Sequence, residues 1–194
     1  MKRRTIPARM CGALVAALAV QAASPVAAAE TFGARLTHQL TPPEYCTSNK
    51  GKMCTWVLME AQGNAGKETA PRNGTVDKIR LVACAPAGSF VLQVVRVKPG
   101  TEKVKAISTG PVVNYQGTKR NCTASKNFDV EEFDVDVPIR KGQSLAVVAT
   151  EVRFMYNSGS GPSIMYDPPL AEGDAFRTTS LDSGFLMIQA ELAP

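Results

Sequence analysis

Histidine is almost absent from this sequence, and its scarcity excludes most of the common catalytic arrangements. The 194 residues include a single histidine, His38. A Ser-His-Asp or Cys-His mechanism would have to be built around that residue, and catalytic zinc usually takes two or three histidine ligands. The sequence also lacks the G-x-S-x-G pattern that presents a nucleophilic serine. We therefore expect His38 to be a polar surface residue and the protein not to be an enzyme.

A long apolar run is missing too. The apolar stretch from Met10 to Val20 is shorter than the roughly 20 residues that a membrane-spanning helix needs. It follows several basic residues and precedes small ones, which is the pattern of a secretory signal peptide. We predict that residues 1–29 are a signal peptide, cleaved after Ala29 or, as the alternative, after Ala22. The mature chain is then expected to be secreted into the extracellular space, with no membrane span.

The sequence has little excess of charge outside this signal. The whole chain has a formal net charge of +5, from 22 basic and 17 acidic residues. Lys2, Arg3, Arg4 and Arg9 leave with the signal peptide, whereas every acidic residue follows it, so the mature chain is nearly neutral. A neutral chain gains little counterion-release free energy on a polyanion. We expect neither nucleic acid nor an anionic membrane surface among its partners.

Free thiols are expected to be absent from the mature chain. Cys11 belongs to the signal peptide, which leaves Cys46, Cys54, Cys84 and Cys122. An even number of cysteines in an oxidising compartment predicts two disulfides. Of the three pairings, we favour Cys46 with Cys54, which closes a short polar loop, and Cys84 with Cys122. A zinc site is the weaker alternative, because the sequence has no C-x-x-C knuckle.

No amphipathic helical period extends beyond two turns, and the chain consists instead of short strand-like segments separated by turn residues. Residues 30–53 are expected to form an irregular N-terminal lead-in, and residues 54–194 one β-sandwich domain. The predicted strands are Cys54–Ala61, Thr75–Cys84, Phe90–Val97, Val104–Tyr115, Phe128–Ile139, Ser144–Phe154 and Phe185–Leu192. This pattern predicts an all-β fold, a β-sandwich of jelly-roll or Greek-key type with about eight strands and two disulfides.

Alternation is clearest in an acidic segment. Within residues 133–137, apolar side chains occupy one face of the predicted strand, and Asp134 and Asp136 occupy the other. We expect the acidic face to be solvated and to protect a sheet edge, in preference to forming a calcium or hydrolase site. Because the dipeptide Glu131-Glu132 interrupts the alternation, we predict a β-bulge there.

The order of turns and strands in four segments resembles a group of uncharacterised secreted domains of high-GC Gram-positive bacteria, which look like jelly rolls. The segments are Asn73–Arg80, Gly88–Arg96, Pro138–Gln143 and Asp167–Gly173. The resemblance implies a jelly-roll fold and export, and it assigns no active-site residue. The chain differs from that group at Gln143, where an Asp usually follows the turn glycine, and at Cys84 and Cys122, which look added.

The segment from Asn157 to Gly173 is the longest predicted connection, and we expect any ligand site to lie there. Tyr156 and Tyr166 are the predicted ligand-binding aromatics, because exposed aromatic faces can stack on sugar rings. The alternative is that both rings pack down and hold the connection against the sandwich. Trp56 lies in an almost wholly apolar strand and is expected in the core.

Carboxylates in the same region are the candidate metal ligands. Asp167, Glu172 and Asp174 lie on backbone that contains glycine and proline. Such carboxylates can converge with carbonyl oxygens in the flexible oxygen cage that calcium prefers. The alternative is a solvated turn. A structural calcium is therefore the cofactor that the sequence suggests.

Three function classes remain open. The leading hypothesis is a secreted non-catalytic binding or surface-interaction module whose partner is a glycan or another cell-envelope component. The first alternative is a structural cell-envelope or extracellular protein without a small ligand. The second is a glycan hydrolase that uses carboxylates alone, which would require an Asp or Glu of raised pKa facing another carboxylate. The oligomeric state is left open by the sequence.

Overall fold

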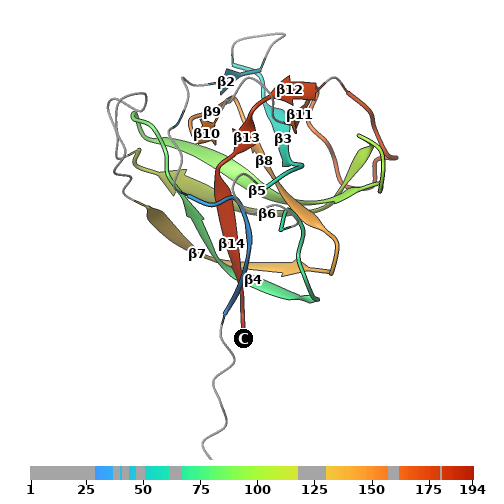
Figure 1. Cartoon of the computed structure of the whole chain (residues 1–194). Coiled ribbons are helices and arrows are strands. Elements are labelled where there is room, and N and C mark those ends of the chain that lie inside the picture. The colour runs from blue at the N-terminus through green and yellow to red at the C-terminus, as the bar shows by residue number, and fades with distance from the viewer. Residues whose placement is uncertain are drawn as a thin grey trace, which may run out of the picture.

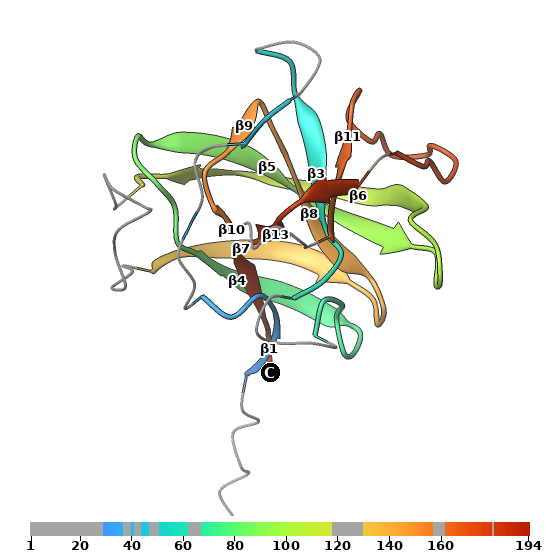
Figure 2. The same ribbon diagram turned by 45° about the horizontal axis from the view of Figure 1, so that its top comes forward.

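Alternating apolar and polar side chains build two antiparallel sheets that face each other (Figures 1 and 2). The computed structural model describes residues 29–36, 40, 44–46, 51–61, 67–117, 130–156, 162–179 and 181–194. No helix occurs among these residues. The all-β, sandwich-like architecture confirms the coarse fold class that the sequence predicts.

One sheet has four strands and the other has six. In spatial order, the four-stranded sheet contains β1 (Glu30–Gly33), β14 (Ile188–Leu192), β4 (Gly74–Leu81) and β7 (Glu131–Ile139). The six-stranded sheet contains β12 (Leu181–Ser183), β11 (Pro162–Tyr166), β3 (Cys54–Leu58), β8 (Ser144–Ala149), β5 (Gly88–Val97) and β6 (Val104–Tyr115). Two short ladders pair β2 (Glu44–Tyr45) with β9 (Glu151–Val152), and β10 (Met155–Tyr156) with β13 (Phe185–Leu186).

Successive strands cross repeatedly between the two sheets. The chain passes from β3 to β4 in the opposite sheet and returns at β5. The β5–β6 hairpin stays within the six-stranded sheet, and the chain then crosses to β7 and back to β8. These crossings place turns from both sheets together at the ends of the sandwich, where side chains from distant parts of the sequence can meet.

The space between the sheets holds the main apolar core. Trp56, Phe32 and Leu92 are each 0 % exposed, and Trp56 therefore belongs to the core as predicted. Burial of an aliphatic or aromatic side chain of this size contributes roughly 1.5–3 kcal/mol. Phe90 and Phe154 pack with their ring centroids 5.2 Å apart within the same cluster.

A second apolar cluster covers part of the outer face of the six-stranded sheet. Val57, Val95, Ile164 and Tyr166 project from three of its strands, β3, β5 and β11, and Leu170 from the following segment closes over them. That segment is tied to the edge of β6 by two backbone hydrogen bonds of 2.9 Å between Val104 and Arg177. The six-stranded sheet is thus buried on both faces over part of its area, which explains its continuous apolar strands.

Two segments expected to be irregular contain strands. The lead-in predicted over residues 30–53 begins with β1, which pairs with β14 from Glu30↔Leu192 to Gly33↔Gln189, and also includes β2. The predicted connection from Asn157 to Gly173 contains β11, which pairs with β3. In each case apolar side chains, Phe32 and Ile164, are 0 % exposed and hold a short segment against the sheet. Burial of a single apolar side chain therefore decides that these segments form strands, although turn residues lie close by.

The alternation predicted for β7 is confirmed, but the predicted bulge is wrong. Asp134 and Asp136 are exposed, and the apolar residues between and beside them face the core. The ladder continues without a shift through Arg80↔Glu132 and Leu81↔Glu131, and the irregularity lies farther along, between Val76 and Lys78 of β4. Glu131 takes an inward position because its carboxylate accepts backbone hydrogen bonds at the end of β6.

One predicted disulfide is present, and the other falls partly outside the described residues. Cys46 and Cys54 are bonded across a sequence separation of 8, with Cα atoms 5.8 Å apart. A loop of this length contributes about 2.5 kcal/mol in the chain-entropy treatment. Cys84 is also disulfide-bonded. Because Cys122 lies outside the described residues, the pairing of Cys84 with Cys122 stays a prediction.

The predicted signal peptide also lies outside the described residues, apart from Ala29. The same is true of His38, so its surface role stays a prediction. Within the described part of the chain, no helix has the length and apolar character needed to cross a membrane.

Candidate functional site

Tyr166 cannot present its ring to a ligand. The side chain is 0 % exposed and lies in the outer apolar cluster. Its hydroxyl is the donor toward two carbonyl oxygens. That of Glu102 lies at 2.9 Å and that of Arg177 at 3.3 Å. Burial raises the pKa of Tyr166 from 10.0 to about 12. The prediction that Tyr166 is a contact aromatic is therefore wrong, and the packed-down alternative holds.

Tyr156 is also committed to packing. Its ring is half-buried and stacks on Phe185, with centroids 6.2 Å apart and an interplanar angle of 25°. The two tyrosines belong to different clusters, since Tyr156 packs beside Met187 and Phe185, and Tyr166 packs on the outer face of the six-stranded sheet. They do not form the shared platform that their flanking positions in the sequence suggested.

The three candidate calcium ligands are not gathered into one site. Glu172 accepts a short hydrogen bond from the backbone N–H of Thr109, and Asp174 accepts one of 3.1 Å from that of Ala171. Asp167 has a buried Oδ2 without a hydrogen-bond partner in the described structure. The described residues contain no group of three or more acidic, cysteine or histidine side chains that could hold a metal. Glu172 and Asp174 instead fix the backbone of the segment that covers the six-stranded sheet.

A groove of about 650 Å³ lies at the open end of the sandwich, between the last residues of β7 and the start of β6. Three basic side chains line it, namely Arg96 from β5, Lys105 from β6 and Arg140 after β7. No acidic residue is among its lining residues. Within the described chain none of the three side chains makes an ion pair. We call this concavity the basic groove.

Strand alternation explains how two of these cations come to face the gap between the sheets. Along β5, Leu92 and Val94 point into the main core, and Arg96 is the next residue on the same face. Lys105 lies directly opposite Arg96 on β6. Like charges in opposite positions of an antiparallel pair repel each other. The sequence places two cations where the row of core residues emerges into solvent, at a cost to the stability of the sheet.

An aromatic ring extends the same row beyond the sheet edge. The Nζ of Lys105 lies 5.1 Å from the centroid of Phe176, whose side chain is 37 % exposed. Phe176 precedes Arg177, the residue that bridges to β6. Arg96, Lys105 and Phe176 therefore follow one another across three neighbouring segments. An exposed aromatic beside a cation offers a ligand both an apolar face and a charge.

Polar groups complete the lining of the basic groove. Asn73, Ser108 and Gln143 lie along it. Gln143 is 3 % exposed, and its Oε1 accepts a hydrogen bond of 2.7 Å from the backbone N–H of Arg140, which holds the turn between β7 and β8. Asn73 Oδ1 accepts one of 2.9 Å from the N–H of Lys141. The groove is thus bounded by a turn whose backbone is fixed by side chains.

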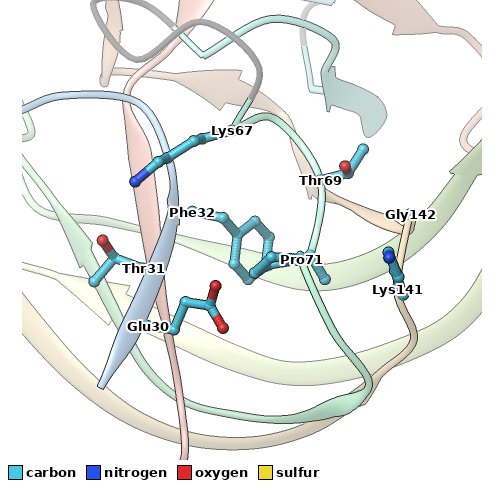
Figure 3. Close-up of a pocket in the computed structure, with 9 residues that line it drawn as sticks. Glu30, Thr31, Phe32, Lys67, Thr69, Pro71, Lys141 and Gly142 are labelled. Carbon is cyan, nitrogen blue, oxygen red and sulfur yellow. The ribbon is translucent and has the colours of Figure 1, made fainter. Parts of the chain in front are cut away.

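A second, smaller concavity of about 180 Å³ lies on the other side of that turn, and Figure 3 shows its lining. Lys67 and Lys141 lie on different sides of the buried Phe32, with Glu30 below it in this view. Glu30 pairs with Arg72 at 3.2 Å, so its charge is already balanced. Neither lysine makes an ion pair within the described residues. We call this concavity the lysine pocket.

None of these cations is predicted as a site residue from the sequence. Arg96 and Arg140 occur in the segments that carry the family resemblance, which implies only a framework role for those segments. The available signal was the alternation in β5, which predicts that Arg96 follows Leu92 and Val94 on the buried face. Comparison of the chain with family models, with curated proteins and with solved structures found no match.

Proposed function

We propose that the protein is a secreted, non-catalytic binding module that binds an anionic glycan in the basic groove. The observation that carries this proposal is the convergence of Arg96, Lys105 and Arg140, which come from three separate segments, on one concavity without an acidic neighbour. Exposed cations that lack ion pairs are ready to bind sulfate, carboxylate or phosphate groups, and Arg does so with paired N–H donors.

The neutral lining favours a sugar polymer as the bearer of these anionic groups. Asn73 and Ser108 supply amide and hydroxyl groups of the kind that hydrogen-bond to sugar hydroxyls. Phe176 supplies a partly exposed aromatic ring next to Lys105, which can contact the apolar face of a sugar ring. A groove of about 650 Å³ lies in the size range of small-ligand sites.

The electrostatics of the carboxylates support a non-catalytic role. A general acid that works near neutral pH needs a raised pKa. The pKa of Glu132 is instead lowered, first by its hydrogen bond with Lys78 and also by the charge of Arg80. Other carboxylates, such as those of Glu131 and Glu172, accept backbone hydrogen bonds and act as structural ties.

The strand order supports the finer fold assignment, and the disulfide-bonded cysteines support the proposed secretion. A jelly roll of eight strands has two four-stranded sheets, and the orders β1-β14-β4-β7 and β3-β8-β5-β6 fit this arrangement. Nearly every connection between these eight strands crosses from one sheet to the other. The remaining strands are additions at the edges. The Cys46–Cys54 disulfide and the disulfide-bonded state of Cys84 are consistent with an oxidising compartment.

The test is titration calorimetry with heparin, polygalacturonate and a neutral glucan. We expect saturable binding of at least one anionic polysaccharide and none of the neutral chain. The double variant Arg96→Gln, Lys105→Gln should bind about tenfold more weakly, since charge-assisted hydrogen bonds are lost. The matched control is Arg35→Gln with Lys52→Gln, which removes two exposed cations outside the groove. Absence of saturable binding would contradict the proposal and favour a structural cell-envelope role.

A further inference from the structure

The basic groove and the lysine pocket share the same two chain segments as a common wall. Ala70 and Pro71 line the pocket while Asn73 lines the groove, and Lys141 lines the pocket while Arg140 lines the groove. Hydrogen bonds join the segments, with Ala70 N donating to Gln143 O at 2.8 Å and Gly142 N donating to Ala70 O at 2.9 Å. Together with the bond from Lys141 N to Asn73 Oδ1, they form a braced ridge between the two concavities.

Cations lie on both sides of this ridge. Arg140 and Lys141 are consecutive residues at its crest and line opposite concavities. Beyond them, Lys67 lies on the pocket side, and Lys105 and Arg96 lie on the groove side. Glu30, the acidic residue of the pocket, is paired with Arg72. Five cations therefore line the two concavities, two in the lysine pocket and three in the basic groove.

We propose that one linear anionic polysaccharide crosses the ridge and occupies the basic groove and the lysine pocket together. This inference rests on the proposed function and assigns to it a polymer with spaced charges, in preference to a single anion or a short sugar. Lys67, Lys141 and Arg140 are all exposed side chains. A single contact with an exposed cation contributes little, because water and salt screen it. Several such contacts along one chain act jointly, since binding in the first concavity raises the effective concentration of the chain at the second.

The braced ridge favours this arrangement over independent sites. Its backbone is held by hydrogen bonds before any ligand arrives, so the spacing between the two concavities is preorganised. A rigid spacing lowers the entropic cost of binding both parts of one chain. The small volume of the lysine pocket, about 180 Å³, fits a charged substituent or one sugar unit in preference to a separate folded partner.

The experiment measures the affinity of the full protein for size-fractionated heparin and polygalacturonate oligosaccharides, from disaccharide to dodecasaccharide. For the wild-type protein, affinity should rise with length until the chain spans both concavities and then level off. The variant Lys67→Gln, Lys141→Gln should keep wild-type affinity for the shortest chains that bind and lose about tenfold for the long ones. For long chains, a plot of the logarithm of the association constant against the logarithm of the salt concentration should have a slope that is smaller in magnitude by about two. The two polysaccharides distinguish sulfate from carboxylate as the bound group.

Controls separate this inference from the proposed function. Arg35→Gln, Lys52→Gln should match the wild-type protein at every length, and urea unfolding should show that all variants are folded. If Lys67→Gln, Lys141→Gln binds long chains as the wild type does, the ridge-crossing path is wrong and the groove proposal stands. If Arg96→Gln, Lys105→Gln leaves binding unchanged at all lengths, the proposed function itself fails. Equal affinity for duplex DNA of the same charge would overturn the assignment to a polysaccharide.

Discussion

At the scale of single residues, Tyr166 shows how a side chain that suits a binding site can serve the core. Its ring closes the outer apolar cluster, and its hydroxyl meets the carbonyl oxygens of Glu102 and Arg177. We expect Tyr166→Ala to lower the free energy of unfolding by about 3–5 kcal/mol, because it leaves a cavity and removes the hydroxyl that donates to the Glu102 carbonyl. Urea denaturation measures this. Val112→Ala, at a side chain that is 60 % exposed, is the control, and an equally small effect of both changes would contradict the burial of Tyr166.

Arg96 illustrates the opposite case, a residue whose position costs stability. It lies directly across from Lys105, and no ion pair in the described structure relieves the repulsion. We expect Arg96→Gln to leave the free energy of unfolding unchanged or to raise it by about 0.5 kcal/mol, with the gain reduced at high salt. Chemical denaturation at two salt concentrations measures the effect. A loss of about 1 kcal/mol or more would show that Arg96 has a structural partner and is not held for ligand binding.

At the scale of elements, the crossing from β6 to β7 depends on one carboxylate. Glu131 accepts hydrogen bonds from the backbone N–H groups of Gln116 at 2.7 Å and Gly117 at 3.0 Å. It thereby ties the first residue of β7 to the end of β6 in the opposite sheet. Gly117 has φ of 70°, so the chain there follows a conformation that few other residues adopt.

Removal of this tie should loosen one end of the sandwich. We expect Glu131→Ala to lower the free energy of unfolding by about 2 kcal/mol, because two backbone donors lose a charged acceptor. Hydrogen exchange at Gln116 and Gly117 should become faster, while exchange in β4 changes little. Glu132→Ala is the matched control, since that exposed side chain contacts Lys78 and Arg80 at the surface, and its loss should lower the free energy of unfolding much less. Equal effects of the two changes would contradict the assigned role.

At the scale of the whole molecule, two buried tyrosines link stability to alkaline pH. Burial raises the pKa of Tyr115 and of Tyr166 from 10.0 to about 12 in the folded state. Between these values the unfolded chain releases protons that the folded protein retains, so the free energy of unfolding falls as pH rises. The stabilising effect is fully present below about pH 10 and is lost by about pH 12. Urea midpoints across this range measure it.

The variant Tyr166→Phe provides the comparison for this pH dependence. Phenylalanine keeps the buried ring and removes one titrating group, so the loss of stability above about pH 10 should be smaller than in the wild-type protein. The variant should also start from a slightly lower stability at neutral pH, because its ring makes no hydrogen bond to Glu102. Parallel curves for the two proteins above about pH 10 would show that Tyr166 titrates normally.

The sequence predicted the long strands of this protein better than its short strands and its ladder irregularities. Segments with sustained alternation or apolar runs, such as Val104–Tyr115, form strands with the expected bounds, because period-2 burial is a local property of the chain. β1 and β11 are not predicted from the sequence, because each is short and is held by the tertiary contacts of Phe32 and Ile164. Turn residues close to these two strands hide them in the sequence pattern. The bulge expected at Glu131-Glu132 was wrong because the inward position of Glu131 is set by hydrogen bonds to another strand.

The candidate site shows where local patterns stop being informative. By itself the sequence determined the all-β class, the Cys46–Cys54 disulfide and the buried position of Trp56, each of which depends on residues close together in the chain. Only the tertiary structure brought Arg96, Lys105 and Arg140 to one groove and placed the lysine pocket across the ridge from it. The physical reason is that the crossings between sheets decide which strand ends meet. The pairing of those ends depends on register and packing over the whole sandwich, which no short stretch of sequence encodes.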